Sequence, residues 1–275
     1  MISPGDKVVS IVPTYQQLYS IPASFGANMA ILHLTKEEEY LPNLEKLKAL
    51  VTPDTKMICI NNPDNPTGVL MSKEVLMEIV EIARSVGTYV LCDETYRHLT
   101  QNDEWCESIA DLYEKGISVS SMSKVFSLAG LRQGWIASRD PALRSVFLLH
   151  RDYTLVSCGV FDEMVSALAL KHSDVILERN RAIVRENLAI LDEWIQKQPH
   201  LHYIKPQAGT TALVDYDFDM SSIEFCDKLY HQTGAFVVPG DCFEQPKSMR
   251  IGYACNKQEL IGGLAAFDQF LKTLE

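Results

Sequence analysis

Short apolar segments alternate with helical segments over the first half of the chain, and this alternation limits the fold more than any other feature. Predicted strands cover residues 7–12, 29–34, 56–60, 89–92, 117–120 and 134–137. Predicted helices lie between them at residues 15–26, interrupted at Pro22, at 44–50 and at 72–85, where Ser72 is the expected cap. Such alternation is typical of a mostly parallel sheet covered by helices. We therefore predict an α/β fold with a mostly parallel, doubly wound sheet.

The pattern changes in the last third of the chain. After a helix that begins at Asp140, a long amphipathic helix is predicted from a cap at Ser173 or Asp174 to about Gln196. Strands at 202–204, 212–217 and 249–253 then mix with helices at 222–234 and 257–274. The sequence thus predicts a large domain over residues 1–170 and a smaller C-terminal α+β domain over residues 171–275.

Charge and cysteine usage exclude several classes of function. The net charge of −11 argues against nucleic-acid binding, which needs basic stripes on the surface. The seven cysteines are scattered, with no C-x-x-C pair and no histidines at metal-ligand spacing, so no metal site is predicted. The scattered cysteines are expected to be reduced thiols, which indicates a cytoplasmic protein. No apolar run approaches the length of a membrane span, so no membrane partner is expected.

Lys124 follows a predicted strand in the segment Ser121-Met122-Ser123-Lys124. A buried lysine can lose its proton and form a Schiff base with an aldehyde. Ligands of open α/β sheets bind at the carboxyl ends of the strands, where this lysine is expected. Two alternatives remain: a solvated loop lysine, and a Ser-x-x-Lys pair in which Ser121 is the nucleophile.

Asp93 ends another apolar strand, and Tyr96 follows three residues later. A carboxylate there can ligate a metal, cap a helix or anchor a cofactor. Beside a pyridine nitrogen it would keep the ring protonated, so that the ring withdraws electrons. Tyr96 could offer its hydroxyl to the same ring. The sequence leaves these roles open.

Asn65-Pro66-Thr67-Gly68 has the composition of a turn. Because a residue before proline is held extended, the Asn65 amide would be fixed in place. The Asn65–Pro66 bond is also a candidate for the cis form.

Tyr15 and Arg250 complete the candidate set. Tyr15, just after the first strand, either stacks on a planar ring or packs in the core. Arg250 lies in an apolar strand, where it either binds a carboxylate through both guanidinium nitrogens or forms an ion pair at a sheet edge.

An amine, an acid, a phenol, an amide and guanidinium groups together suit a cofactor with an aldehyde, a ring nitrogen, a phenolic oxygen and a phosphate. Pyridoxal phosphate has these groups. The order and spacing of the residues resemble the class I/II aminotransferases, pyridoxal-phosphate enzymes of fold type I, over essentially the whole chain. The motifs are specific in combination and weak singly.

The resemblance implies a role for each residue. Lys124 matches the catalytic Schiff-base lysine, and Ser121 and Arg132 match the groups that bind the cofactor's phosphate. Asp93 matches the acid at the pyridine nitrogen. Residues that match the remaining contacts are Tyr96 and Asn65 at the phenolic oxygen, Tyr15 stacked on the ring, and Arg250, with Asn65, at the substrate's carboxylate.

The resemblance further implies amino-acid and 2-keto-acid substrates and a homodimer. One departure concerns the N-terminus: family members carry a further segment ahead of the strand at residues 7–12, with a Gly-rich phosphate-binding turn. We therefore expect a chain that lacks this segment. The sequence leaves open a β-lyase or decarboxylase of the same fold, and an inactive truncated remnant.

Overall fold

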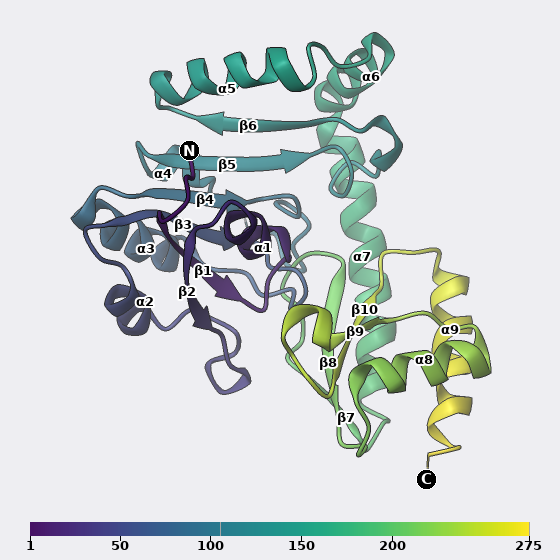
Figure 1. Cartoon of the computed structure of the whole chain (residues 1–275). Coiled ribbons are helices and arrows are strands. Elements are labelled where there is room, and N and C mark those ends of the chain that lie inside the picture. The colour runs from purple at the N-terminus through teal and green to yellow at the C-terminus, as the bar shows by residue number, and fades with distance from the viewer. Residues whose placement is uncertain (105, 275) are drawn as a thin grey trace.

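The computed structural model describes residues 1–104 and 106–274, and this part of the chain holds two sheets flanked by helices (Figure 1). The larger sheet has the strand order β2-β1-β3-β4-β5-β6. Neighbouring strands run parallel except β6, which is antiparallel to β5. Its strands are β1 (Lys7–Val12), β2 (Asn28–His33), β3 (Thr55–Asn61), β4 (Tyr89–Asp93), β5 (Gly116–Ser121) and β6 (Gly134–Ser138).

Helices cover both faces of this sheet because side chains alternate along each strand. Val8 packs with Leu18 and Leu143 on one face, while Val9 packs with Leu47 and other apolar residues on the opposite face. The first face is covered by α1 (Gln17–Ser24) and α5 (Pro141–Thr154), and the second by α2 (Leu44–Leu50), α3 (Lys73–Val86) and α4 (Ile109–Leu112). The predicted α/β class with a mostly parallel, doubly wound sheet is confirmed.

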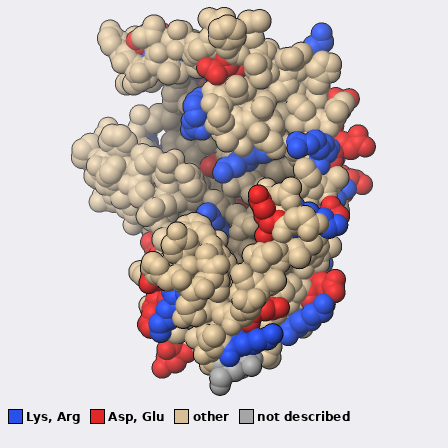
Figure 2. Space-filling view, turned by 90° about the vertical axis from the view of Figure 1, so that its right-hand side faces the viewer, with Lys and Arg blue, Asp and Glu red and all other residues tan. Residues whose placement is uncertain are grey.

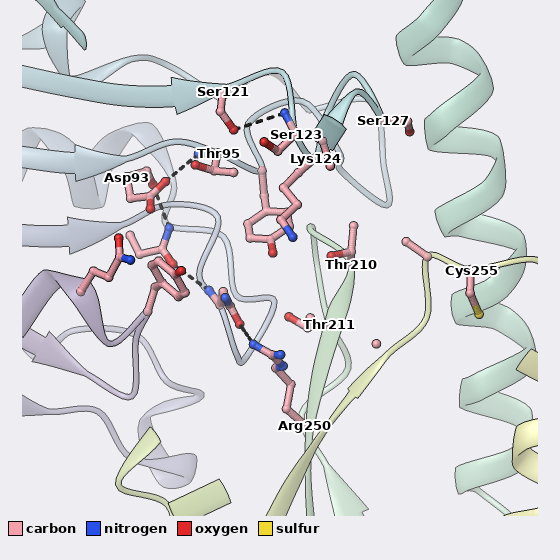
Figure 3. Close-up of a pocket in the computed structure, with 18 of the residues that line it drawn as sticks. Asp93, Thr95, Ser121, Ser123, Lys124, Ser127, Thr210, Thr211, Arg250 and Cys255 are labelled. Atoms are coloured by element: carbon pink, nitrogen blue, oxygen red, sulfur yellow. Dashed lines mark hydrogen bonds between the residues drawn. The ribbon is translucent and has the colours of Figure 1, made fainter. Parts of the chain in front are cut away.

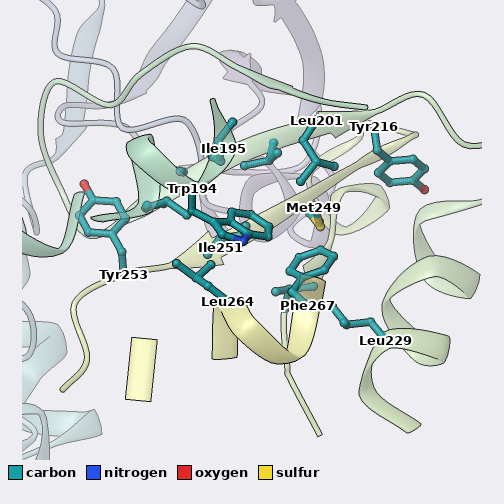
Figure 4. Packing of buried hydrophobic residues seen from close by; sticks show 14 of the residues in the cluster. Trp194, Ile195, Leu201, Tyr216, Leu229, Met249, Ile251, Tyr253, Leu264 and Phe267 are labelled. Carbon is teal, nitrogen blue, oxygen red and sulfur yellow. The ribbon is translucent and has the colours of Figure 1, made fainter. Parts of the chain in front are cut away.

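The smaller sheet is antiparallel, in the order β7-β8-β10-β9. It packs against helices through a cluster of buried apolar residues that includes Trp194, Leu229 and Phe267 (Figure 4). Its elements are β7 (Leu201–Tyr203), β8 (Thr211–Tyr216), β9 (Val238–Pro239), β10 (Ser248–Gly252), α8 (Ser222–Thr233) and α9 (Lys257–Leu271). The long helix α7 (Ser173–Ile195) runs from the larger sheet to this cluster (Figure 1).

Three local features differ from the sequence predictions. α1 is not interrupted at Pro22 and continues to Ser24, although proline removes one helical hydrogen bond and crowds the preceding turn. A helix that was not predicted, α6 (Val160–Lys171), leads almost directly into α7. The N-cap residue of α7 is therefore His172, whereas the sequence predicted a cap at Ser173 or Asp174. The His172 side chain forms no capping hydrogen bond.

The predicted boundary between two domains, at residue 170, lies in the last turn of α6 and stays a prediction. Among the described residues, no helix is both long enough and apolar enough to cross a membrane.

The stability of the C-terminal cluster depends on Phe225. This fully buried ring stacks on Tyr216 with a centroid separation of 4.3 Å and also contacts Phe267 and Phe270. Phe225→Ala should lower the free energy of unfolding by about 3–5 kcal/mol, because truncation leaves a cavity. Chemical denaturation measures the change. Ile223→Ala on the same helix is the control: its side chain is 61% exposed, so the expected change is within about 0.5 kcal/mol. Equal losses in the two variants would contradict the role of Phe225.

Candidate functional site

A cavity of about 940 Å³ lies at the carboxyl ends of the parallel strands. Because β1 has β2 on one side and β3 on the other, the loops after β1 and β3 leave the sheet in opposite directions and open a crevice. The space-filling view shows a hollow in this face of the molecule, with lysine and arginine side chains at its rim (Figure 2). The cavity volume of about 940 Å³ is within the usual range for a small-molecule site.

Every site residue predicted from the sequence lines this one cavity: Tyr15, Asn65, Asp93, Tyr96, Ser121, Lys124, Arg132 and Arg250. Asp93, Ser121 and Lys124 come from strand ends and loops of the larger sheet, whereas Arg250 reaches in from the smaller sheet (Figure 3). The cavity is thus assembled from segments up to 240 positions apart, the separation of Cys255 and Tyr15 (255 − 15).

Lys124 and Arg132 lie in one connection between paired strands. Ser121 of β5 pairs with Gly134 of β6, so the twelve residues between them (122–133) must return to where they started. Arg132 adopts a left-handed conformation with φ of 52° and donates a hydrogen bond to the carbonyl of Ala129 at 2.8 Å. The Lys124 side chain is exposed, so the burial expected for this amine is not provided by the described residues.

Asp93 ends β4 as a partly buried acid. Burial raises the pKa of its carboxyl above the usual value, and hydrogen bonds from Thr95 oppose that rise. The backbone N–H of Thr95 donates to Asp93 Oδ1 at 2.9 Å. The Thr95 hydrogen bonds favour the ionised carboxylate, which could accept a hydrogen bond from a facing protonated nitrogen. Tyr96 is buried, and burial likewise raises the pKa of its phenol.

Asn61, which the sequence analysis missed, fixes Asn65. Its side-chain oxygen accepts a hydrogen bond from the Asn65 backbone N–H at 2.9 Å, and its amide nitrogen donates to the Asp93 carbonyl at 2.8 Å. The cis peptide bonds are Val12–Pro13 and Asn62–Pro63, so the candidate cis bond at Asn65–Pro66 was wrong. The buried Asn65 side chain is therefore held between the ends of β3 and β4.

Arg250 reaches this amide from the other sheet: its Nη1 donates to Asn65 Oδ1 at 3.0 Å. Its guanidinium also lies over the Phe243 ring, 4.9 Å from the centroid, where the ring face attracts a cation. Burial lowers the pKa of Arg250, and the nearby phenols of Tyr96 and Tyr15 oppose that shift. A guanidinium can bind a planar carboxylate through two of its nitrogens.

The charge of the cavity is opposite to that of the protein. Its charged lining residues are Lys124, Arg132, Arg250 and Asp93, three cations and one anion, whereas the whole chain has a net charge of −11. Local excess positive charge favours ligands with negative groups such as phosphate and carboxylate. A cofactor with an aldehyde, a basic ring nitrogen and a phosphate therefore fits the residues present.

Further lining residues were not identified from the sequence. Gln17 begins α1, Thr95 and Ser123 stand beside predicted site residues, and Thr210, Thr211 and Cys255 come from loops and strand ends of the smaller sheet. The neighbours of predicted residues could have been found by proximity in the sequence. Nothing local indicated that Thr210, Thr211 and Cys255 fold back onto the larger sheet.

The family model described as aminotransferase class I and II matches residues 1–267 of the chain. The chain belongs to the class I and II aminotransferase family. A solved pyridoxal-phosphate-dependent aminotransferase from Streptococcus suis 89-1591 superposes with a TM-score of 0.96 at 46% identity, covering 100% of this chain and 73% of that one.

Other characterised enzymes are similar to this chain at lower sequence identity, and not all of them are named aminotransferases. Capreomycidine synthase of Streptomyces vinaceus is 28% identical over 98% of this chain and 69% of its own length. An aspartate aminotransferase of Thermotoga maritima is 24% identical over 99% of this chain and 71% of its own. This class I and II member is thus a pyridoxal-phosphate-dependent aminotransferase.

Close contact between loops of the two sheets positions the site of this aminotransferase. Gly68 follows Asn65 by three residues, has φ of +73°, and a Cβ there would lie 2.5 Å from the Cβ of Pro206. Gly68→Ala should therefore separate the loops and lower the free energy of unfolding by about 2–4 kcal/mol, combining backbone strain with overpacking.

Gly5→Ala is the matched control in denaturation experiments. Gly5 also has a positive φ, +88°, but no atom lies within 4 Å of its Cβ position, so only the backbone cost of about 1–2 kcal/mol is expected. If Gly68→Ala cost no more than Gly5→Ala, the contact between loops would not contribute to stability.

Proposed function

We propose that this aminotransferase binds pyridoxal 5′-phosphate in the cavity and transfers an amino group between an amino acid and a 2-keto acid, with Lys124 as the catalytic residue. The observation that supports this most strongly is that an amine, a partly buried acid of raised pKa and two guanidiniums line one cavity. When bound, this cofactor supplies an aldehyde that condenses with amines and a cationic ring that withdraws electrons from the substrate.

The residues of the larger sheet would hold this group. The Lys124 amine would hold its aldehyde, and the Ser121 hydroxyl and the Arg132 guanidinium would hold its phosphate. The ionised Asp93 carboxylate would accept a hydrogen bond from the protonated ring nitrogen and so keep the ring cationic, and the hydrogen bonds from Thr95 favour this ionised form. Tyr96 and Asn65 would contact the phenolic oxygen, and Tyr15, which is 39% exposed and lines the cavity, would stack on the ring.

Arg250 and Lys124 would then act on the substrate. Arg250, together with Asn65, binds the α-carboxylate, which turns the α-hydrogen toward the lysine. The Lys124 amine would then serve as general base and accept the proton from the α-carbon. The exposed position of Lys124 leaves its long side chain free to reach both places.

Lys124→Ala should lower turnover by about 10²–10⁴-fold or more, because it removes both the covalent attachment and the base. The measurement is keto-acid formation from a panel of amino acids, with pyruvate or 2-oxoglutarate as acceptor and added cofactor. Lys48→Ala, an exposed lysine on α2, is the control and should keep full activity. Full turnover by Lys124→Ala would rule out its proposed role. Release of ammonia or carbon dioxide without exchange would instead indicate a lyase or decarboxylase.

We also propose that the protein is a homodimer. Exposed apolar side chains gather on α5 and α6, including Tyr153 at 85%, Phe161 at 83% and Met164 at 64% exposure. The two helices are adjacent, since Arg151 approaches Glu163 to 3.9 Å. Large apolar side chains exposed on two neighbouring helices support burial against another polypeptide, and we assign a second copy.

Sedimentation velocity tests the assignment at micromolar concentration. The wild type should sediment as a dimer, and Phe161→Asp should shift it toward the monomer, because a charge would be buried in the contact. Glu45→Gln on the distant helix α2 is the control for surface charge and should not change the mass. A monomeric wild type would contradict the proposal.

A cytoplasmic location is proposed on the state of the cysteines. All seven are free, and Cys59, Cys92, Cys106 and Cys226 are buried. Free thiols in this number are typical of a reducing compartment. Fractionation of the cells that make the protein tests this, and recovery outside the cytosolic fraction would contradict it.

A further inference from the structure

Two buried asparagines interrupt the apolar stripe of α7. One face of this helix is buried, with residues at spacings of three and four: Leu177, Asn180, Val184, Asn187 and Leu191. Asn180 is 4% exposed and Asn187 is 1% exposed. Burial of an amide is unfavourable unless its polar atoms are hydrogen-bonded, so asparagines on an apolar face indicate specific partners.

Asn180 is hydrogen-bonded to the loop that carries Lys124. Its Nδ2 donates to the carbonyl of Val125, the residue after Lys124, at 2.8 Å. Within this loop the Ser127 N–H donates to the Lys124 carbonyl at 3.0 Å, which makes a turn. Leu177, three residues before Asn180, packs in the same apolar cluster as Val125. α7 thus fixes the backbone next to Lys124, while the exposed lysine side chain is not part of this contact.

Asn187 is hydrogen-bonded to the part of the cavity wall that comes from the smaller sheet. Its Nδ2 donates to the carbonyls of Tyr253 at 2.7 Å and Cys255 at 2.9 Å. Cys255 and the intervening Ala254 line the cavity. The segment directly follows β10, the strand that carries Arg250. α7 therefore also fixes the backbone on the Arg250 side of the cavity.

A single continuous helix therefore connects two sets of lining residues. Asn180 and Asn187 are seven residues apart, which corresponds to about 10 Å along a helix axis. Seven residues are close to two turns, so both amides project from the same face. The helix runs from the larger sheet to the smaller one (Figure 1). The helix axis thus sets the spacing between the loop that carries Lys124 and the wall at residues 253–255.

We propose that Asn180 and Asn187 are positioning residues with separate tasks: Asn180 holds the loop of Lys124 for the cofactor, and Asn187 holds residues 253–255 for the substrate. The proposal rests on the proposed function, because that function assigns Lys124 to the cofactor and Arg250 to the substrate. Neither asparagine is among the described residues that line the cavity, so both act through the backbone that they bind.

The first test compares Asn180→Leu with Asn187→Leu in the presence of cofactor. Leucine has a similar volume and no donor, so each variant removes hydrogen bonds from a buried position. Asn180→Leu should lower kcat and weaken pyridoxal-phosphate affinity, measured by absorbance titration, each by about fivefold, with KM within about twofold. Asn187→Leu should raise KM for the amino acid that the wild type uses fastest by about fivefold, with cofactor affinity within about twofold.

Each variant is the matched control for the other, because a general loss of stability would change both in the same way. Where a leucine variant does not fold, alanine at the same position removes the donor without added bulk. Cofactor affinity lowered as much by Asn187→Leu as by Asn180→Leu would overturn the separate tasks. An equal rise of KM in the two variants would do the same.

The second test uses the chain without cofactor and separates this proposal from the proposed function. Hydrogen exchange measured by mass spectrometry follows residues 122–128 and 252–255, which both contain hydrogen-bonded backbone N–H groups. Asn180→Leu should speed exchange in the first segment by about fivefold, and Asn187→Leu in the second, because loss of a bond favours local opening.

The proposal would be overturned if Asn180→Leu exchanged no faster than Asn187→Leu at residues 122–128, or if the reverse held at residues 252–255. If the wild type binds no cofactor, the proposed function fails, and the exchange rates still decide whether each asparagine holds its segment.

Discussion

The parallel alignment of β1, β3, β4 and β5 is the constraint on which the site depends. Their register places Asn61 beside Asp93, and Asp93 beside Val119 of the next strand. Residues that follow these strands therefore meet at one edge of the sheet, although they are far apart in the sequence. The apolar strands thus determine where an amine, an acid and several hydroxyls come together.

The smaller sheet completes the cavity through a few specific contacts. Arg250 bonds to Asn65, and Lys36 of the 3₁₀ turn η1 (Lys36–Glu38) pairs with Asp215 of β8 at 2.7 Å. Gly68 permits the close approach of the loop that carries Pro206. Because Asn61 in turn fixes Asn65, the position of Arg250 is coupled to the ends of β3 and β4. A ligand that moved the Arg250 guanidinium would therefore act on Asn65 and Asn61 through these hydrogen bonds.

Much of the fold follows from local pattern. α2 was predicted with the same limits, and Ser72 caps α3 as expected, accepting a bond from the Val75 N–H. α6 was missed because apolar residues occur around its whole circumference and Gly159 ahead of it offers no side-chain cap. The two-residue strand β9 is defined only by its pairing with β10, which no local pattern reveals.

The candidate site, like the fold, was predicted only in part from local pattern. The motif order and the family resemblance predicted eight site residues, and all eight line one cavity. Their individual roles stay predictions. Asn61, Thr210 and Cys255 were not predicted because their place depends on how strand ends and sheets pack. Thr14 Oγ1 and Asp64 Oδ1 are buried and have no hydrogen-bond partner among the described residues. Only the structure reveals this, because threonine and aspartate are ordinary residues of a turn.

The covalent site of the cofactor is the most direct test of this account. The purified chain would be mixed with pyridoxal phosphate, reduced with borohydride, digested and mapped by mass spectrometry. We expect a visible absorbance band before reduction and the reduced cofactor on the peptide that contains Lys124. Label on another lysine, or no label although the cofactor is bound, would contradict the central role of Lys124.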